Sequence, residues 1–481
     1  MVSRRRENYE KRSVKQGRMQ PAAEPNEIGA STPFDFTAKR LTPYGGLLPV
    51  ATMVEKLGFE QLVTDTLTIA RVPRAMRAYQ FVLAMVIGLY IGFARLHQLR
   101  FVARDSIVTG ILHVTQLPPP STLWRFLDSL LRHVAQQILR VQATLRQRVW
   151  AASHVRLATV TVDTDTTIHT IYGDKMGARK SYNPKNKGKK SYQPILTFLA
   201  ETREYLWGEL HNGDRPTGKQ IATHLRGVFT ALPVSDAKRQ ARADSGFYCW
   251  EAVEAYEHAG CRFVVVARKT ARLVAQLTQA TWTASPDTDA DAQCEFRYQP
   301  TGWPRPYRFV ALRYEAPPGE PTSAVEQYQL FATDAYTYRV FVTNFTNPIA
   351  PVVWFYARRA SAENLIKEAN NDAGLAAHPS HRFDVNGNHF QLTMPAYNLN
   401  CWLMLFQRDE TVTDTTTMRH TTLATARLTF LFVAAKIWRH AGRVGVSYSA
   451  DYAEQAVLQR LMGRLRRMTG AFAPVIKLAF T

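Results

Sequence analysis

The sequence predicts an α/β protein (α+β overall) in which a mixed sheet with helices is preceded by a helical domain and interrupted by a mainly β insertion. Short β-branched runs at 157–162, 195–199 and 263–266 alternate with helical stretches such as 220–232 and 250–258. This alternation is typical of a partly parallel sheet covered by helices. The 481 residues are 46% hydrophobic, which is enough to bury at least one sizeable core.

The N-terminal part divides into an arm and a helical region. Residues 1–30 are polar and basic, so we expect them to be disordered until they meet an anionic surface. Residues 31–150 have apolar residues three and four apart, with breaks at Pro73 and at Pro118-Pro119-Pro120, and are interpreted as a helical DNA-binding domain. A purely structural helical lid on the next domain fits the same pattern.

The remainder of the chain is divided by changes in hydrophobic pattern. Apolar residues between 271 and 348 fall in short runs bounded by Pro, Gly and Asp, which predicts β structure alone, and long helices follow at 352–371 and 387–407. Trp282 and Trp303 of the insertion are either core residues or candidates to stack on a displaced base. The predicted parts are 151–270, the first part of the core; 271–350, the β-rich insertion; 351–410, the final core helices; and 411–481, a basic helical C-terminal region for DNA contact or dimerisation.

Charge indicates the class of partner. The net charge is +21 and the isoelectric point about 9.9, spread along the chain, so the expected partner is a polyanion bound over an extended surface, such as double-stranded DNA. The most apolar segment, 81–94, is shorter than the roughly 20 residues that span a bilayer, and we expect a buried helix and no membrane partner.

The cysteines and the N-terminus indicate the compartment. The basic start lacks the apolar stretch of a secretory signal, and the four cysteines are far apart, without zinc-site spacing. We therefore expect a cytoplasmic protein, associated with the bacterial nucleoid. The cysteines are Cys249, Cys261, Cys294 and Cys401.

Two acidic positions follow predicted strands. The run 157–162 leads into Asp163-Thr164-Asp165-Thr166-Thr167, and Asp244 lies at a turn before the helix that begins near Trp250. Active sites gather at the ends of sheet strands. Taken alone, each aspartate is more often a helix cap or turn residue, and strand alternation would put Asp163 and Asp165 on the same side.

A third acid lies on a predicted helix. Tyr356, Arg359, Glu363, Lys367 and Asn370 are three or four residues apart, so they share one helical face. An ordinary surface helix, with Glu363 and Lys367 paired, has the same pattern.

These positions together resemble the insertion-sequence DDE transposases, in the branch with a Tyr-x2-Arg-x3-Glu-x6-Lys signature. Tyr356, Arg359 and Glu363 fit the spacing, while Asn370 stands where the signature has Lys. The resemblance extends over about 45–440. It includes Asp165-Thr166-Thr167 with Ile171-Tyr172-Gly173, Tyr182-Asn183-Pro184-Lys185, Asp244-Ser245-Gly246-Phe247, Leu117 to Thr122, and Tyr397-Asn398-Leu399.

The resemblance implies an RNase H-like catalytic core and a metal-dependent site. Asp165, Asp244 and Glu363 would be catalytic and would hold two Mg²⁺ ions, with Mn²⁺ able to substitute, because hard cations prefer carboxylate oxygens. In similar transposases the catalytic Asp directly precedes small hydroxyl residues, which favours Asp165 and leaves Asp163 and Asn370 in supporting positions around the site.

The remaining candidates concern DNA. Arg359 and Lys367 are expected to neutralise phosphate, and Tyr356 to stack or hydrogen-bond near the scissile nucleotide. The expected function is cut-and-paste transposition by a homodimer on paired terminal inverted repeats. The alternatives are an RNase H-like metal-dependent nuclease and a catalytically inactive, transposase-derived DNA-binding protein. The glycine-containing loop 175–190 is read as phosphate-contacting or as an ordinary solvated hairpin; its DNA-binding candidates are Lys180, Lys185, Lys187, Lys189 and Lys190.

Overall fold

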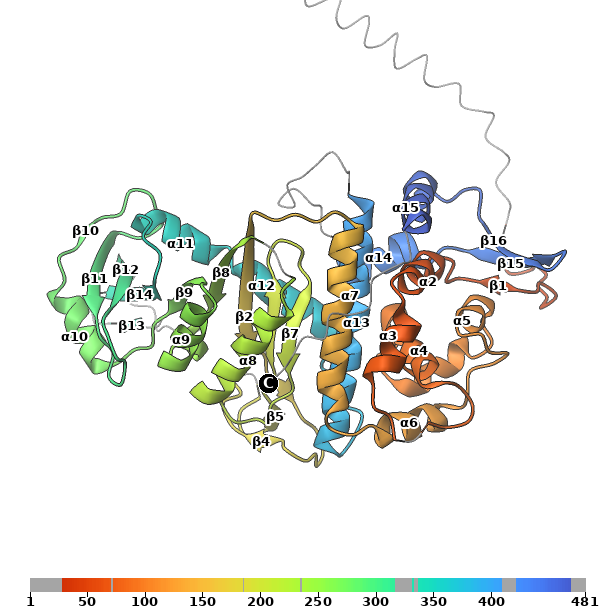
Figure 1. Ribbon diagram of the computed structural model, residues 1–481, viewed down its shortest axis with the longest axis horizontal. Coiled ribbons are helices and arrows are strands. Elements are labelled where there is room, and N and C mark those ends of the chain that lie inside the picture. The colour runs from red at the N-terminus through yellow and green to blue at the C-terminus, as the bar shows by residue number, and fades with distance from the viewer. Residues whose placement is uncertain are drawn as a thin grey trace, which may run out of the picture. The chain divides into compact units, whose positions relative to one another are not determined.

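The computed structural model describes most of the chain. The described residues are 28–70, 72–184, 186–233, 236–315, 331–332, 336–408 and 421–468; most of the predicted basic arm, and parts of the insertion and of the C-terminal region, lie outside them. The chain divides into Met1–Arg40 and one compact unit, Leu41–Thr481, which contains every helix and strand described (Figure 1).

The first part of the compact unit is helical, as predicted. Helix α4 is apolar on all sides, and accordingly almost all of its residues are buried, with α13 packed against it. No single described helix is long and apolar enough to cross a membrane; only α4 and η1 taken together, bent by 85°, meet that test. The elements are α2 (Leu47–Lys56), α3 (Phe59–Thr66), α4 (Ala78–Ile91), η1 (Leu96–Val102), α5 (Ser106–Ile111), α6 (Pro120–Ser129) and α7 (Val134–Ala152).

A mixed sheet forms the core. Its central strands lie in the order β7-β6-β2-β8-β9, in which β2, β8 and β9 are parallel and β2, β6 and β7 antiparallel. This order, with the first strand in the middle, is that of an RNase H-like sheet and confirms the predicted fold class. The elements are β2 (Thr159–Thr166), β6 (Ile195–Leu199), β7 (Tyr205–Glu209), α8 (Gly218–Ala231), β8 (Lys238–Ala243), α9 (Trp250–His258) and β9 (Arg262–Val266).

The insertion extends the same sheet by antiparallel strands beyond β9. The prediction of β structure alone was wrong at its start, where Thr270 caps helix α10 and Leu273 and Leu277 bury one face. Trp303 is buried against Tyr248 and Trp250 of the core. Trp282 donates to the Leu277 carbonyl, and the Arg313 guanidinium lies over its ring, so both tryptophans are packed against other parts of the protein. Its elements are α10 (Ala271–Gln279), β10 (Thr283–Ala284), β11 (Ala292–Tyr298), β12 (Tyr307–Glu315), β13 (Phe331–Ala332) and β14 (Tyr336–Thr343).

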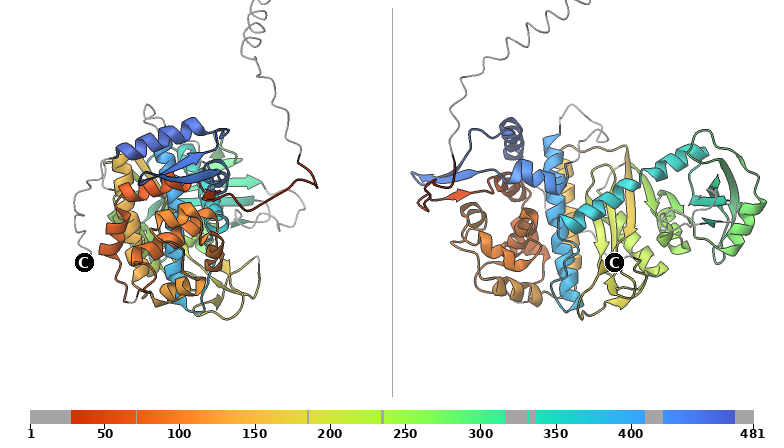
Figure 2. Two further views of the ribbon diagram at one scale, coloured as in Figure 1. Left: turned by 90° about the vertical axis from the view of Figure 1, so that its right-hand side faces the viewer. Right: turned by 180° about the vertical axis from the view of Figure 1, so that it is seen from behind.

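Three helices return the chain from the insertion to the core. The single helix predicted over 352–371 is two, α11 (Ile349–Ala357) and α12 (Ala360–Asn371), because the Arg359 N–H closes a tight turn on the Tyr356 carbonyl. Seen from behind, α11 and α12 run from the insertion toward α13 (Figure 2). Helix α13 (Phe383–Gln407) is buried along most of its length and packs against α4 and α7.

The C-terminal region is not wholly helical, contrary to the prediction. Strands β15 (Ala435–His440) and β16 (Arg443–Tyr448) form a hairpin, and β1 (Leu41–Thr42) adds to β15. The two turn residues, Ala441 and Gly442, both have positive φ, which matches the twist of paired strands and turns the chain back. Around the hairpin lie α14 (Leu423–Ala426), the π-helical turn η4 (Arg427–Leu431) and α15 (Gln455–Arg467).

Candidate active site

The three predicted acids come from three separate elements. Asp165 lies near the end of β2, Asp244 directly follows β8, and Glu363 lies in the first turn of α12. Strands β2 and β8 are parallel neighbours, with Thr164 opposite Ala243, so both aspartates leave the sheet at the same edge. Helix α12 contacts β2 and brings Glu363 to that edge.

The electrostatic environment of Asp165 includes the other two carboxylates. The pKa of Asp165 is raised to about 7, first by burial and then by the negative charges of Asp244 and Glu363, while Arg359 opposes the shift. Burial is the largest cause of the shift, and the neighbouring carboxylates add negative charge that a cation would offset.

Arg359 lies among these carboxylates and is 6% exposed. Its Nη2 is 2.7 Å from Asp165 Oδ2, and its Nη1 is 3.7 Å from Glu363 Oε1. The Nη2 contact is close but not aligned as a hydrogen bond, and Nε also lacks a partner among the described residues. The guanidinium therefore supplies positive charge to the cluster.

Tyr356 lies beside the same cluster, at the end of α11. Its ring is buried against Phe341, with ring centres 4.8 Å apart, and Arg339 lies over it. Burial raises the pKa of Tyr356 to about 12, and Asp244 and Asp165 add to the shift while Arg359 opposes it. Its hydroxyl therefore stays protonated, but its ring has little surface on which a base could stack.

The loop after Asp244 is fixed by backbone hydrogen bonds. The Gly246 N–H donates to Asp244 Oδ1 at 2.9 Å, and a Cβ on Gly246 would lie 2.8 Å from that oxygen, so a larger residue would displace the carboxylate. Arg268 donates to the carbonyls of Ser245 and Gly246, and Arg215 also donates to Ser245. These contacts orient the Asp244 carboxylate.

Asp163 is paired with Arg242. Both its oxygens accept from Arg242, through Nε and Nη2 at 2.6 Å each, and both side chains are buried. Arg242 Nη1 also donates to the Phe355 carbonyl at 2.9 Å, which ties β2 and β8 to α11 one residue before Tyr356. Sequence reasoning missed Arg242, although it stands two residues before Asp244 in the same strand.

Asn370 and Lys367 were predicted to lie on one helical face, but their side chains have different surroundings. Asn370 donates to Thr167 Oγ1 and accepts from His169 Nε2 at 2.8 Å, and His169 Nδ1 lies 2.9 Å from His378 Nε2. Burial lowers the pKa of His169 to about 4, so this hydrogen-bonded chain is neutral. Lys367 is exposed, one turn before Asn370.

Comparison with known protein families decides the assignment. A family model described as transposase DDE domain group 1 matches residues 28–470. This chain is a DDE transposase. No curated protein matches it. Among solved structures, a piggyBac transposase synaptic complex with hairpin DNA aligns at 9% identity over 74% of each chain, with a TM-score of 0.38.

The lysines predicted to meet DNA lie mostly on the surface of this transposase. Lys180, Lys187, Lys189 and Lys190 are exposed, in or beside the small sheet of β3 (His169–Thr170), β4 (Arg179–Lys180) and β5 (Lys190–Tyr192). Lys190 pairs with Asp174 at 3.0 Å. Lys185 lies outside the described residues.

DDE transposase domains generally use divalent metal ions. Within the described ranges, no group of three or more His, Cys, Asp or Glu is already arranged to hold a metal. Asp165, Asp244 and Glu363 nevertheless supply carboxylates, which are the hard oxygen ligands that such ions prefer.

Proposed function

We propose that this transposase binds the terminal inverted repeats of its element, cuts the DNA at the element's ends and joins the freed 3′-hydroxyls to target DNA, through a hairpin intermediate. The observation that carries the proposal is the gathering of Asp165, Asp244 and Glu363 around Arg359 at one edge of an RNase H-like sheet.

Asp165, Asp244 and Glu363 are the residues assigned to hold two Mg²⁺ ions, or Mn²⁺ in their place. Bound there, the ions would lower the pKa of a nucleophilic water or hydroxyl and stabilise the leaving oxygen. Because Asp165 has a pKa near 7, its carboxyl must lose its proton before it serves as a ligand.

Arg359 is assigned to the scissile phosphate. Its guanidinium lies beside the carboxylates, where its positive charge can offset the negative charge of DNA brought next to three acids. The Tyr356 hydroxyl, protonated at neutral pH, is assigned as a hydrogen-bond donor beside the same phosphate, in place of stacking.

The remaining assignments concern the path of the DNA. Lys367 and the exposed lysines of the β4–β5 hairpin are assigned to phosphates that flank the cut, and the helical part, 31–150, to the inverted repeat. The basic C-terminal region, 411–481, is assigned to DNA contact or dimerisation. Two element ends have to be processed together, so the proposed active assembly is a homodimer.

The test is cleavage and joining of a labelled duplex that carries the element's own end, with Mg²⁺. Glu363→Gln keeps the shape of the side chain but removes a charged ligand, and is expected to lower the cleavage rate by about a thousandfold, or roughly 4 kcal/mol in the barrier. Glu55→Gln, on the exposed surface of α2, is the matched control and should cleave at the normal rate.

The products distinguish the alternatives. Joined and hairpin products support transposition, whereas cleavage without joining supports an RNase H-like nuclease. DNA binding without any metal-dependent cleavage supports a catalytically inactive DNA-binding protein. Cleavage by Glu363→Gln at the full rate would overturn the assignment of the three acids.

A further inference from the structure

The hairpin of β15 and β16 is a basic element for which the proposed function leaves the partner open. Residues 435–448 include Lys436, Arg439 and Arg443 and contain no Asp or Glu. Strand β15 pairs with β1 only through its first two residues, so 437–446 is a ribbon of two strands. Both strands extend beyond the neighbouring helices at one end of the compact unit (Figure 1, Figure 2). A basic ribbon that projects in this way is suited to an anionic partner.

Strand pairing places the side chains of the hairpin on two faces. Residues directly opposite each other share a face, and so do alternate residues along a strand. One face packs against the body of the protein at its base, where Ile437 contacts the hydrophobic core and the Tyr448 hydroxyl donates to the Gly45 carbonyl at 3.1 Å. The opposite face, the ribbon face, consists of Lys436, Trp438, His440, Arg443, Gly445 and Ser447. All of these except Gly445 are exposed, so the ribbon face is open to solvent.

Trp438 forms the centre of the ribbon face. Its ring lies directly over Gly445 of the facing strand, where an added Cβ would come within 2.1 Å of Trp438 Cζ2, so a larger residue would displace the ring. The Trp438 side chain is nevertheless 41% exposed. Lys436 lies at one end of the ring and Arg443, opposite His440, at the other, and four residues of strand separate these ends by about 13 Å. The ribbon face therefore has an apolar centre between two cations.

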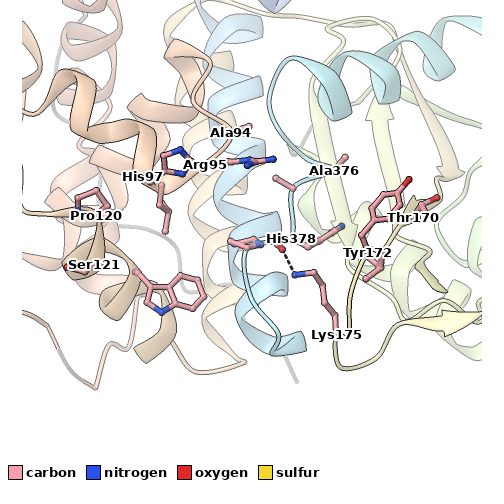
Figure 3. Close-up of a pocket in the computed structure, with 15 residues that line it drawn as sticks. Ala94, Arg95, His97, Pro120, Ser121, Thr170, Tyr172, Lys175, Ala376 and His378 are labelled. Carbon is pink, nitrogen blue, oxygen red and sulfur yellow. Dashed lines mark hydrogen bonds between the residues drawn. The ribbon is translucent and has the colours of Figure 1, made fainter. Parts of the chain in front are cut away.

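Among the described residues, the cations of the hairpin have no partner. The side chains of Lys436, Arg439 and Arg443 make no hydrogen bond or ion pair there. A second basic surface, around a cavity of about 640 Å³, is different, because its Lys175 Nζ donates to the His378 carbonyl at 2.8 Å (Figure 3). Cations that are not paired within the protein favour the binding of a polyanion.

The base of the hairpin is anchored to the rest of the compact unit. The Gly45 N–H donates to the Val433 carbonyl at 2.9 Å, and the Ser449 N–H donates to the Ala434 carbonyl at 3.2 Å. Strand β1 adds to β15 at the same place. Because the base is fixed, the projecting part of the ribbon loses less conformational entropy when it binds a partner.

We propose that the ribbon face binds the major groove of double-stranded DNA. The major groove is about 12 Å wide and admits a two-stranded β ribbon, whereas the minor groove is about 6 Å wide. Lys436 and Arg443 contact phosphates on opposite sides of the groove, and the Trp438 ring lies against base edges. The inference rests on the proposed function for the presence of DNA, and it assigns this part of the C-terminal region to DNA contact in place of dimerisation.

A second copy of the chain is the alternative partner of the hairpin. Strand β16 is at the edge of its sheet, and an edge strand can pair with another chain. Pairing two copies of β16 would bring together three cations from each hairpin, Lys436, Arg439 and Arg443, and neither hairpin contributes an acid. The charge therefore favours DNA over a second copy.

The test measures binding of a labelled duplex that carries the element's own end, by fluorescence anisotropy at several salt concentrations, with the full chain and without divalent cations. The double variant Lys436→Ala with Arg443→Ala loses two phosphate contacts. The slope of log affinity against log salt concentration should fall by about 2, and binding should weaken about thirtyfold at about 0.15 M salt. Lys219→Ala with Arg226→Ala removes two exposed cations of α8, to which no DNA contact is assigned, and should change neither value. An unchanged slope in the hairpin variant would overturn the proposal.

Chemical footprinting identifies the groove. Dimethyl sulfate methylates guanine N7, which lies in the major groove, and adenine N3, which lies in the minor groove. At protein concentrations that saturate the duplex, the intact protein should protect guanine N7 atoms that remain reactive with the double variant of Lys436 and Arg443. A difference confined to adenine N3, or no difference between the two proteins, would contradict the assignment to the major groove.

Two further measurements separate this proposal from its alternatives. Sedimentation equilibrium without DNA tests the second copy: if the hairpin variant self-associates more weakly than the intact protein and keeps its salt slope, the ribbon face is an interface between copies and the proposal is wrong. Glu363→Gln should keep the salt slope and the footprint of the intact protein, because the hairpin contact does not involve the carboxylates. Failure of the hairpin proposal is therefore distinct from failure of the three acids, which is measured by cleavage.

Discussion

The two ends of α12 differ in chemistry although they belong to one short helix. At its start, Arg359 and Glu363 lie with Asp165 in a cluster of charges, and the pKa of Asp165 is raised to about 7 by burial and by neighbouring carboxylates. At its end, Asn370 joins Thr167 and His169 in a neutral hydrogen-bonded chain. One end carries unbalanced charge, and the other has its hydrogen bonds satisfied.

This difference teaches how the helix serves the site. Like charges held together cost free energy that is recovered only when a cation or substrate binds, so such a cluster needs a rigid support. The neutral chain at the other end supplies one anchor, and the Asp163–Arg242 pair, bonded to the Phe355 carbonyl, supplies another at α11. Asn370, the residue that departs from the signature, therefore helps to hold this end of α12 in place.

The largest effect on stability is expected from the buried ion pair. Arg242→Met leaves Asp163 buried without its partner, and should lower the free energy of unfolding by about 3–5 kcal/mol, measured by urea denaturation. The double variant Asp163→Leu with Arg242→Met removes both charges and should recover most of this loss. A loss below about 1 kcal/mol in Arg242→Met would show that the pair does not anchor α11.

A second, smaller effect on stability distinguishes Asn370 from Lys367, the two candidate residues near the end of α12. Asn370→Ala leaves the buried His169 N–H without an acceptor, and should lower the free energy of unfolding by about 1–3 kcal/mol. DNA affinity of the folded variant should keep its normal salt dependence, because no charge is lost.

Lys367→Ala is the matched variant on the same helix. Its side chain is exposed, so stability should change by less than about 0.5 kcal/mol, while the slope of log affinity against log salt concentration should fall by about 1. The reverse pattern, in which Asn370→Ala alters the salt slope and Lys367→Ala leaves it unchanged, would assign the phosphate contact to position 370, where the signature has Lys.

The sequence predicted well what depends on local pattern. Alternating strand and helix runs predicted the α/β core, and strand ends indicated Asp165 and Asp244, because both features are set by neighbouring residues. The break between α11 and α12 was not predictable, since no proline or glycine marks it; the Arg359 N–H closes the turn there, and its side chain pairs with Asp165, almost 200 positions earlier. The hairpin at 435–448 was taken for helix because its turn, Ala441-Gly442, lacks the usual Asn-Gly signal.

A pH-dependent effect tests the neutrality of the hydrogen-bonded chain at Asn370. Burial lowers the pKa of His169 from its ordinary 6.5 to about 4, so the folded state binds this proton less readily than the unfolded state. The stability contributed by neutral His169 is complete above pH 6.5 and is lost as the pH falls toward 4. At pH 5.5 the loss of stability due to His169 is about 1.4 kcal/mol. Glutamine does not titrate, so His169→Gln should lack this loss when urea denaturation is compared at pH 7.5 and 5.5.

The control is His258→Gln, at an exposed position, which should lose as much stability as the intact protein does. If His169→Gln lost as much stability as the intact protein between pH 7.5 and 5.5, His169 would not be held neutral in the folded protein. The contrast between the two ends of α12 would then be wrong.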